Sequence, residues 1–467
     1  MTKPLRLAQF LGYATGDAAN NLAFSMTSMF LLIYYTDVVG LSAAAVGTLF
    51  LVVRFWDAFA DVAAGRIVDR TQTRWGKFRP FLLFGSLPLL LLSVAVFSVS
   101  GGLSHDGALA YALVSYALLG FAYSLVNIPY GSMATAMTQR PDERAKLATF
   151  RVFGSNLTIL MLALVVAPEI KGSNDLQRSL TVTTLVFVAV GFALYLFTFL
   201  TAKEQVQRDV PKVSARETID TLKQNRPLVM LCLSSLMFLI GMFALQTVAI
   251  YYARDVLGNA NYYIVLTIVQ TAGTLLAAAF VPHFVRTIGK KHAYLVCGVI
   301  AIAGGIGLAL TPASAPVTAF FFFFVIGVGL GGVNTLMWAL EADTVEYGEW
   351  KTGIRTEGTT YALFSFTRKM GQAIGGAAAA YAIGIGGYVA NASPQPDSAV
   401  TAIKVAAGIV PAVVIVVALA IMLAYPLTEA RFREIVGDVV QRRLAHQAKA
   451  VAAGQPILPP TTPPVKT

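Results

Sequence analysis

Three charged side chains interrupt a long apolar stretch in the segment Arg54-Phe-Trp-Asp57-Ala-Phe-Ala-Asp61. The surrounding sequence, from Ala43 to Ala64, predicts a membrane-spanning helix on which the two aspartates, four residues apart, share one face. Each charge at bilayer depth opposes insertion by about 2.5–3.5 kcal/mol on insertion scales. A cluster kept against that cost must face the protein interior or a watery cavity. It indicates an ion or proton pathway.

The composition is that of a polytopic membrane protein. Of 467 residues, 56% are hydrophobic and only 13% are charged, whereas soluble proteins carry about 25% charge. Both cysteines, Cys232 and Cys297, fall within apolar runs, which argues against a disulfide framework and a paired-thiol metal site. The net charge of +11 comes from basic residues that lie mostly in the predicted loops and terminal segments, and it does not predict binding to nucleic acid. No metal and no cofactor is expected.

Hydrophobic segments predict an all-α membrane protein of twelve transmembrane helices in two six-helix bundles. Spans of about 20 residues are predicted near 9–35, 42–66, 80–100, 107–136, 148–170, 179–200, 228–253, 261–285, 291–311, 315–340, 357–385 and 401–425. Six and six around a polar loop is the pattern of a secondary transporter. The expected units are an N-terminal bundle (1–200), a cytoplasmic central loop (201–227), a C-terminal bundle (228–427) and a tail (428–467) with a disordered end at 457–467.

The placement of lysine and arginine predicts the orientation of the chain. Most of the 35 basic residues lie in the terminal segments and in the loops on the same side as the termini. The opposite side carries only Lys171, Arg178, Arg254 and Lys404. The positive-inside rule therefore places both termini in the cytoplasm, and a bacterial inner membrane is expected.

Evidence for an internal repeat is modest. The segment Arg70–Lys77 after the second span is echoed by Val285–Lys291 after the eighth. Duplication of a six-helix unit explains the echo, and so does the general basic character of short cytoplasmic loops. The chain contains no Gly-x-x-x-x-Gly-Lys-Ser/Thr loop, so hydrolysis of ATP is not expected. Nothing else in the sequence predicts an enzyme.

Several longer motifs stand out along the chain: Tyr34-Tyr-Thr-Asp37, the Trp56–Asp61 segment, Arg74-Trp-Gly-Lys-Phe-Arg-Pro80, Asn127-Ile-Pro-Tyr130 and Asp343-Thr-Val-Glu-Tyr-Gly-Glu-Trp-Lys351. These motifs resemble the glycoside–pentoside–hexuronide:cation symporter family, and most closely its glucuronide permeases. The resemblance implies the major-facilitator fold, a sugar site between the two bundles, and uptake driven by a cation gradient.

The resemblance also implies a cation-coupling site formed by Asp57, Asp61 and Ser124. Melibiose permeases of the family have an asparagine in this site where the present chain has Ala60. Sodium needs several oxygen ligands, whereas a proton needs only one carboxylate, so this departure favours proton coupling. The alternative interpretation is a structural Arg–Asp network that holds the bundle together.

Family positions near the sugar predict the substrate-binding residues Asn20, Asn21, Tyr123, Asn127, Arg151, Trp338 and Lys369. Asn21 and Asn127 replace acids of melibiose permeases, and amides would tolerate a uronic acid carboxylate that acids would repel. Asparagines can also serve helix–helix contacts. Arg151 and Lys369 are the candidate cations for that carboxylate. Arg368 and Lys369 are consecutive, so their side chains would leave a helix about 100° apart and cannot both face the cavity equally. Lys369 matches a lysine of the family and is therefore the predicted substrate residue. It could instead bridge to Asp57 and Asp61.

Charged residues at the predicted cytoplasmic helix ends are expected to form salt bridges between the bundles that lock the outward-open state. They are Asp69, Arg70, Arg74, Lys77, Asp343, Glu346, Glu349 and Lys351.

The sequence therefore predicts a monomeric, proton-coupled symporter that imports glucuronides or related glycosides across the lipid bilayer. A sodium-coupled carrier of neutral glycosides and a non-transporting sugar sensor remain alternatives. The sequence does not identify the sugar, and net export stays open.

Overall fold

The structure is a computed structural model that describes residues 4–138, 140–172, 175–205, 224–353 and 357–452. Regular structure in these ranges is helical, apart from one isolated β-bridge between Thr73 and Gly76. The all-α fold predicted from composition is confirmed. The predicted central loop lies mostly, and the end of the tail at 457–467 wholly, outside the described residues.

The helices of the first half are α1 (Leu7–Ile33), α2 (Ala43–Arg70), α3 (Ser86–Val96), α4 (His105–Met137), α5 (Pro141–Gly172) and α6 (Leu176–Thr201). A π-helical turn, Tyr34–Val38, extends α1, and another, Phe81–Gly85, precedes α3. Side-chain oxygens of Ser42, Ser104 and Asp175 accept backbone N–H groups at the starts of α2, α4 and α6. These caps satisfy N–H groups that the helix itself leaves unpaired.

The helices of the second half are α8 (Arg226–Tyr251), α9 (Tyr262–Leu310), α10 (Pro316–Thr352), α11 (Glu357–Ile385), α12 (Asp397–Lys404), α13 (Val410–Leu423) and α14 (Glu429–Ala452). A π turn at Tyr252–Val256 extends α8, and another at Val405–Ile409 joins α12 to α13. The predicted spans 261–285 and 291–311 both lie in α9, which is interrupted at Gly289 by a backbone φ of 77°.

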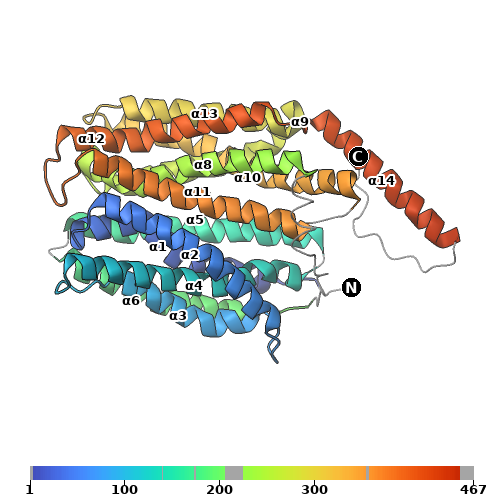
Figure 1. The fold of residues 1–467 in the computed structure, drawn as a ribbon, viewed down its shortest axis with the longest axis horizontal. Helices are drawn as coiled ribbons and strands as arrows, with labels where there is room; N and C mark the ends of the chain where they lie inside the picture. Colours follow the sequence, from blue (N-terminus) through green and yellow to red (C-terminus); the bar gives the residue numbers. More distant parts are fainter. Residues whose placement is uncertain (1–3, 139, 173–174, 206–223, 354–356, 453–467) are drawn as a thin grey trace.

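The helices pack as two bundles. Helices α1–α6 pack mainly on one another, as do α8–α13, and the bundles meet where α2 packs on α11, α1 on α8 and α5 on α9. Figure 1 shows the second-half helices above those of the first half. Within the described residues, eight helical segments are long and apolar enough to cross a membrane by length and composition, and one of them, α9, contains two of the predicted spans. The arrangement is the predicted fold of twelve spans, whereas the exact domain boundaries stay a prediction.

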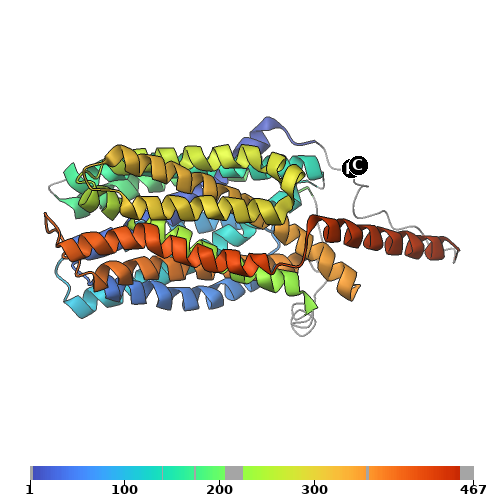
Figure 2. The same ribbon diagram turned by 90° about the horizontal axis from the view of Figure 1, so that it is seen from above.

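Two ends of the molecule matter for the site. Helix α1 begins, and α13 ends, at the right in Figure 1; we call this the terminal end. Helix α14 projects beyond it (Figure 2), and Trp350 of α10 holds α14 by donating from Nε1 to Asp438 Oδ2 at 3.0 Å. The other end, which holds the turns Tyr34–Val38 and Tyr252–Val256, is called the far end. The positive-inside prediction makes the terminal end cytoplasmic.

The two far-end turns also bear on the repeat. Tyr34-Tyr-Thr-Asp-Val and Tyr252-Ala-Arg-Asp-Val each form a π turn at the end of the first span of a bundle. The glycines that follow, Gly40 and Gly258, both have a positive φ, of 80° and 74°. Matching local structure at equivalent places favours duplication of a six-helix unit. The alternative was that the two basic segments are alike only because short cytoplasmic loops are generally basic.

Candidate functional site

The two aspartates of α2 lie where the bundles meet, because α2 packs between α4 of its own bundle and α11 of the other. As the four-residue spacing predicts, Asp57 and Asp61 are directed to the same side. Asp57 is buried and Asp61 is half-buried. A small pocket beside them is lined by Arg54, Asp57, Asp61, Phe366, Lys369 and Met370.

Asp61 joins the two bundles. Its Oδ1 accepts a hydrogen bond of 2.6 Å from the Ser124 hydroxyl on α4, and its Oδ2 forms an ion pair with Lys369 on α11. The side chains of Asp61 and Lys369 keep 24% and 29% of their surface exposed. Ser124 and Lys369, which the sequence analysis predicted on two other helices, therefore both contact the Asp61 carboxylate. Lys369 takes the bridging position that the sequence left as an alternative to substrate binding.

Asp57 has different partners. Its Oδ2 accepts from Arg54 at 2.9 Å, and Arg54 also donates to the Tyr116 hydroxyl at 3.3 Å. Among the described residues its Oδ1 has no hydrogen-bond partner. That oxygen lies against Gly120 of α4, where an added Cβ would be only 2.2 Å away. Tyr116 and Gly120 were not predicted; their seven- and four-residue offsets from Tyr123 and Ser124 on the same helix are the only signal that could have found them.

On α1 and α5, Asp17 organises two predicted substrate residues. Arg151 Nε donates to Asp17 Oδ1 at 2.8 Å, and Asn21 Nδ2 donates to Asp17 Oδ2 at 3.1 Å. Asn20 is instead buried and accepts from the Tyr195 hydroxyl of α6 at 2.8 Å. Asn20 therefore serves a contact within the first bundle, the alternative that asparagines in spans allow.

The remaining predicted residues lie on α4 and α10. Tyr123 stacks on Phe24 with ring centroids 5.6 Å apart, and Phe24 contacts Phe243 of the second bundle edge-on. Asn127 follows one turn later and is half-buried. Trp338 keeps 37% of its surface exposed. A role of Tyr123, Asn127 and Trp338 in binding substrate stays a prediction.

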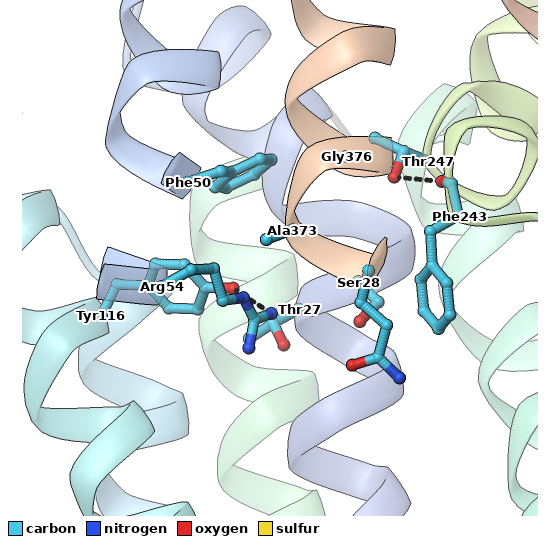
Figure 3. A pocket seen from close by; sticks show the side chains of 10 residues that line it. Thr27, Ser28, Phe50, Arg54, Tyr116, Phe243, Thr247, Ala373 and Gly376 are labelled. Atoms are coloured by element: carbon cyan, nitrogen blue, oxygen red, sulfur yellow. Dashed lines mark hydrogen bonds between the residues drawn. The ribbon is translucent and has the colours of Figure 1, made fainter. Parts of the chain in front are cut away.

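A second cavity, shown in Figure 3, lies between the two bundles. It is lined by Thr27, Ser28, Phe50, Arg54, Tyr116, Phe243, Thr247, Gln372, Ala373 and Gly376. These residues come from α1, α2 and α4 of one bundle and from α8 and α11 of the other. Arg54 borders both this cavity and the pocket of the aspartates. The cavity was not predicted, because no motif marks residues from five helices.

The far end is closed by a polar cluster that the sequence analysis also missed. Arg254 forms ion pairs with Asp37 and Asp255, and it donates to the Tyr388 hydroxyl. Tyr388 in turn donates to Asp37 Oδ1 at 2.8 Å. Asn391 Nδ2 donates to the Asp37 carbonyl at 2.7 Å. Asp37 belongs to the first bundle and its partners to the second, so these contacts join the bundles.

Three of the predicted gating residues at the terminal end have contacts within their own half of the chain. Arg74 stacks on Trp75, the Lys77 backbone N–H donates to Glu204, and Asp343 accepts from Lys290 at 2.7 Å. Arg70 and Lys351 are exposed, and Glu346 and Glu349 are half-buried. The side chain of Asp69 lies outside what the structure describes. The role of these residues in locking the outward-open state stays a prediction.

The site contains no cluster suited to a metal ion: among the described residues, no group of three His, Cys, Asp or Glu side chains could hold one. Neutralising the Asp61 carboxylate would remove its ion pair with Lys369, so the charge on Asp61 can control a contact between the bundles. The arrangement can also surround a polar solute with amides, aromatic rings and paired charges.

Comparison with known proteins finds relatives along nearly the whole chain. The sequence matches the MFS/sugar transport protein family over residues 12–429. A glucuronide carrier protein homologue of Escherichia coli is 45% identical over 96% of this chain and 98% of that protein. An isoprimeverose transporter of Lactiplantibacillus pentosus is 34% identical, over 84% of this chain and 83% of that protein. An inner membrane symporter of E. coli is 31% identical, over 88% and 89%.

Solved structures share the fold. The nucleoside transporter NupG has a TM-score of 0.66 at 14% identity, over 89% of this chain and 99% of that one. A bacterial homologue of the human lysosomal transporter Spinster, inward-facing and occupied, has a TM-score of 0.62 at 15% identity, over 92% and 99%. At such identities the likeness concerns the fold alone.

Proposed function

Since the chain belongs to the MFS/sugar transport protein family, we propose that it is a proton-coupled symporter that imports glucuronides or related glycosides by alternating access. The inner membrane location of one relative supports the same location here, with both termini in the cytoplasm. The transport unit is a single chain.

The observation that carries this proposal is the position of Asp61. Its carboxylate holds the Ser124 hydroxyl of its own bundle and the Lys369 ammonium of the other. A proton on Asp61 removes the negative charge and with it the ion pair to Lys369. Proton binding thus weakens a contact that must change when the bundles rock. Coupling follows because the ion and the conformational change use the same carboxylate.

The choice of the proton rests on the oxygen ligands available. Ala60, which has no side-chain oxygen, is buried beside the aspartates. Asp61, Ser124 and Asp57 offer carboxylate and hydroxyl oxygens, but two of their four carboxylate oxygens already bind cationic side chains, Arg54 and Lys369. A titratable carboxylate is sufficient for a proton, whereas Na⁺ would have to displace these cations.

The choice of an anionic sugar rests on the amides. Asn21 and Asn127 place neutral groups where an acid would repel a carboxylate. The relative named as a glucuronide carrier homologue is 45% identical, and a glucuronide carries such a carboxylate.

Alternating access is supported by the closed far end. The Asp37–Arg254 cluster joins the bundles on that side, while the Asp61–Lys369 pair stays partly exposed. We infer that the structure is the inward-facing state, from which substrate leaves toward the terminal end.

The test is uptake into proteoliposomes that contain the purified full chain. Labelled phenyl β-D-glucuronide is supplied under an inward proton gradient, and separately under a sodium gradient at equal pH on both sides. Accumulation is expected with the proton gradient only. Asp61→Asn should abolish accumulation, because an amide cannot cycle a proton, while exchange of internal for external glucuronide continues.

Other outcomes identify the alternatives. Accumulation driven by sodium at fixed pH would replace the proton by sodium. Accumulation of phenyl β-D-glucoside alone would make the chain a carrier of neutral glycosides. Binding of the glucuronide without any exchange would make it a sensor.

A further inference from the structure

Arg54 stands between the two cavities that lie where the bundles meet. It is the residue that the cavity of Figure 3 and the pocket of the aspartates share among their described lining residues. Helix α2 begins shortly after the far-end turn Tyr34–Val38, so its residues lead away from the far end in order of their numbers. Phe50, one turn before Arg54, lines the cavity, and Asp61, about two turns after it, lines the pocket. Arg54 therefore separates a space on the far-end side of α2 from the carboxylates.

The cavity of Figure 3 is polar and leads toward the far end. Thr247 lines it and lies one turn before Tyr251 on α8. Tyr251 shares a hydrogen bond of 2.9 Å with Thr36 in the contact that joins the bundles at the far end. A polar space of this kind is suited to water, which needs two to four polar partners. Hydroxyl and amide groups from four helices are available in the lining: Thr27, Ser28, Tyr116, Thr247 and Gln372.

The charge of Arg54 decides what can pass from this cavity to the carboxylates. Among the ten described residues that line the cavity, Arg54 is the only charged one. Its NH1 donates to Asp57 Oδ2 at 2.9 Å and its NH2 to the Tyr116 hydroxyl at 3.3 Å. These two bonds, one within α2 and one to α4, fix the guanidinium at the boundary. A fixed positive charge repels hydronium and other cations, whereas it lets neutral water approach.

We propose that Arg54 is an electrostatic barrier that keeps protons in the cavity of Figure 3 from reaching Asp57 and Asp61 while the far end is closed. The proposal rests on the proposed function as a proton-coupled symporter. Such a symporter stays coupled only if its carboxylate exchanges the proton with one side of the membrane at a time. With the barrier in place, the carboxylates exchange protons with the terminal end alone, the side toward which the substrate leaves. Lys369, which pairs with Asp61, adds a second positive charge beside the carboxylates.

A proton leak in the absence of any sugar tests the barrier. The purified full chain is placed in liposomes that contain a pH-sensitive dye, and a potassium diffusion potential drives protons inward. Arg54→Gln keeps a polar side chain but loses the charge, so acidification should be about tenfold to a hundredfold faster than in wild type, as expected for removal of a unit charge beside the path. Arg54→Gln also takes from Asp57 its cationic partner. The double variant Arg54→Gln/Asp57→Asn, which removes both charges of the pair, is therefore measured in parallel and should leak as well.

Two matched variants separate the charge from the packing. Arg54→Lys keeps the charge, and Tyr116→Phe keeps Arg54 but removes the hydroxyl that Arg54 contacts. Neither should leak faster than wild type. A leak in either of them as fast as in Arg54→Gln would overturn the barrier and assign the leak to disturbed packing around the cavity.

The remaining outcomes are also decisive. A wild-type leak rate in both variants that lack the charge would overturn the barrier and leave Arg54 as a structural partner of Asp57. The proposed function is tested separately, by adding phenyl β-D-glucuronide to wild-type liposomes. If the sugar does not accelerate proton entry there, proton coupling itself is contradicted, whatever the leak rates of the variants.

Discussion

At the scale of single residues, a glycine on the neighbouring helix determines how closely the Asp57 carboxylate can approach that helix. Gly120 of α4 allows Asp57 Oδ1 to lie where a Cβ would come within 2.2 Å. The other carboxylate oxygen is held by Arg54 at 2.9 Å. A methyl group at position 120 has no room, so the carboxylate or the helices must shift. Interiors are packed densely enough that such overpacking costs about 1–3 kcal/mol.

We therefore expect Gly120→Ala to impair coupling. Displacing Asp57 changes its ion pair with Arg54 and the charge beside Asp61, so the accumulation ratio under a fixed proton gradient should fall about tenfold or more. Gly131→Ala is the matched control, since it lies on the same helix and its Cβ would meet nothing within 4 Å. The measurement is steady-state accumulation in proteoliposomes at equal protein content. Equal accumulation by the two variants would show that the site tolerates the displacement.

At the scale of elements, hydropathy was sufficient to predict the spans, and helical spacing was sufficient to place Asp57 and Asp61 on one face. The partners of charged groups were predicted only in part. Lys369 could be matched to Asp61 through the family resemblance, but Asp17 as the partner of Arg151 could not. A sequence fixes which residues share a helix face, whereas the rotation of each helix against its neighbours depends on packing across the whole bundle.

Element ends were also only partly predictable. The tail was expected to be polar and partly disordered, yet its first part forms α14 from Glu429 to Ala452. The contacts of Trp350 with Asp438 and of Arg442 with the Trp350 carbonyl explain this helix. They join residues about 90 positions apart, and local propensity carries no information about such contacts.

The turn inside α9 offers a test at this scale. Gly289 has a φ of 77° and a ψ of 162°, a conformation that is nearly restricted to glycine and costs other residues about 1–3 kcal/mol. An added Cβ would only touch Glu429 at 3.4 Å, so the cost comes from the backbone. Gly289→Ala should therefore lower the apparent melting temperature in detergent by a few degrees. Gly437→Ala in α14, where the Cβ meets nothing within 4 Å, should not lower it. Equal melting temperatures would show that this turn can be rebuilt without strain.

At the scale of the whole molecule, the two halves meet at the far end through related segments. Tyr34-Tyr-Thr-Asp37 ends the first span of one bundle, and Tyr251-Tyr-Ala-Arg-Asp255 ends the first span of the other. Thr36 and Tyr251 share a hydrogen bond of 2.9 Å, and Asp37 pairs with Arg254. Duplicated segments thus supply opposite charges to one contact. When the bundles rock, this contact must open as a unit, so its strength sets how much of the population faces inward.

Removing one charge from that contact should shift the population. Asp37→Asn keeps the shape but loses the charge-assisted bonds from Arg254, which are worth about 1.5–3 kcal/mol, so the outward-facing fraction should rise about tenfold to a hundredfold. The reporter is a cysteine in place of Ser28, which lines the cavity of Figure 3, in a chain without Cys232 and Cys297. Its labelling by a membrane-impermeant maleimide from the far-end side should accelerate accordingly. Asp397→Asn, an exposed acid at the start of α12, is the control and should leave the rate unchanged. An unchanged rate in Asp37→Asn would mean that apolar packing between α1 and α8, rather than the charged cluster, holds the far end closed.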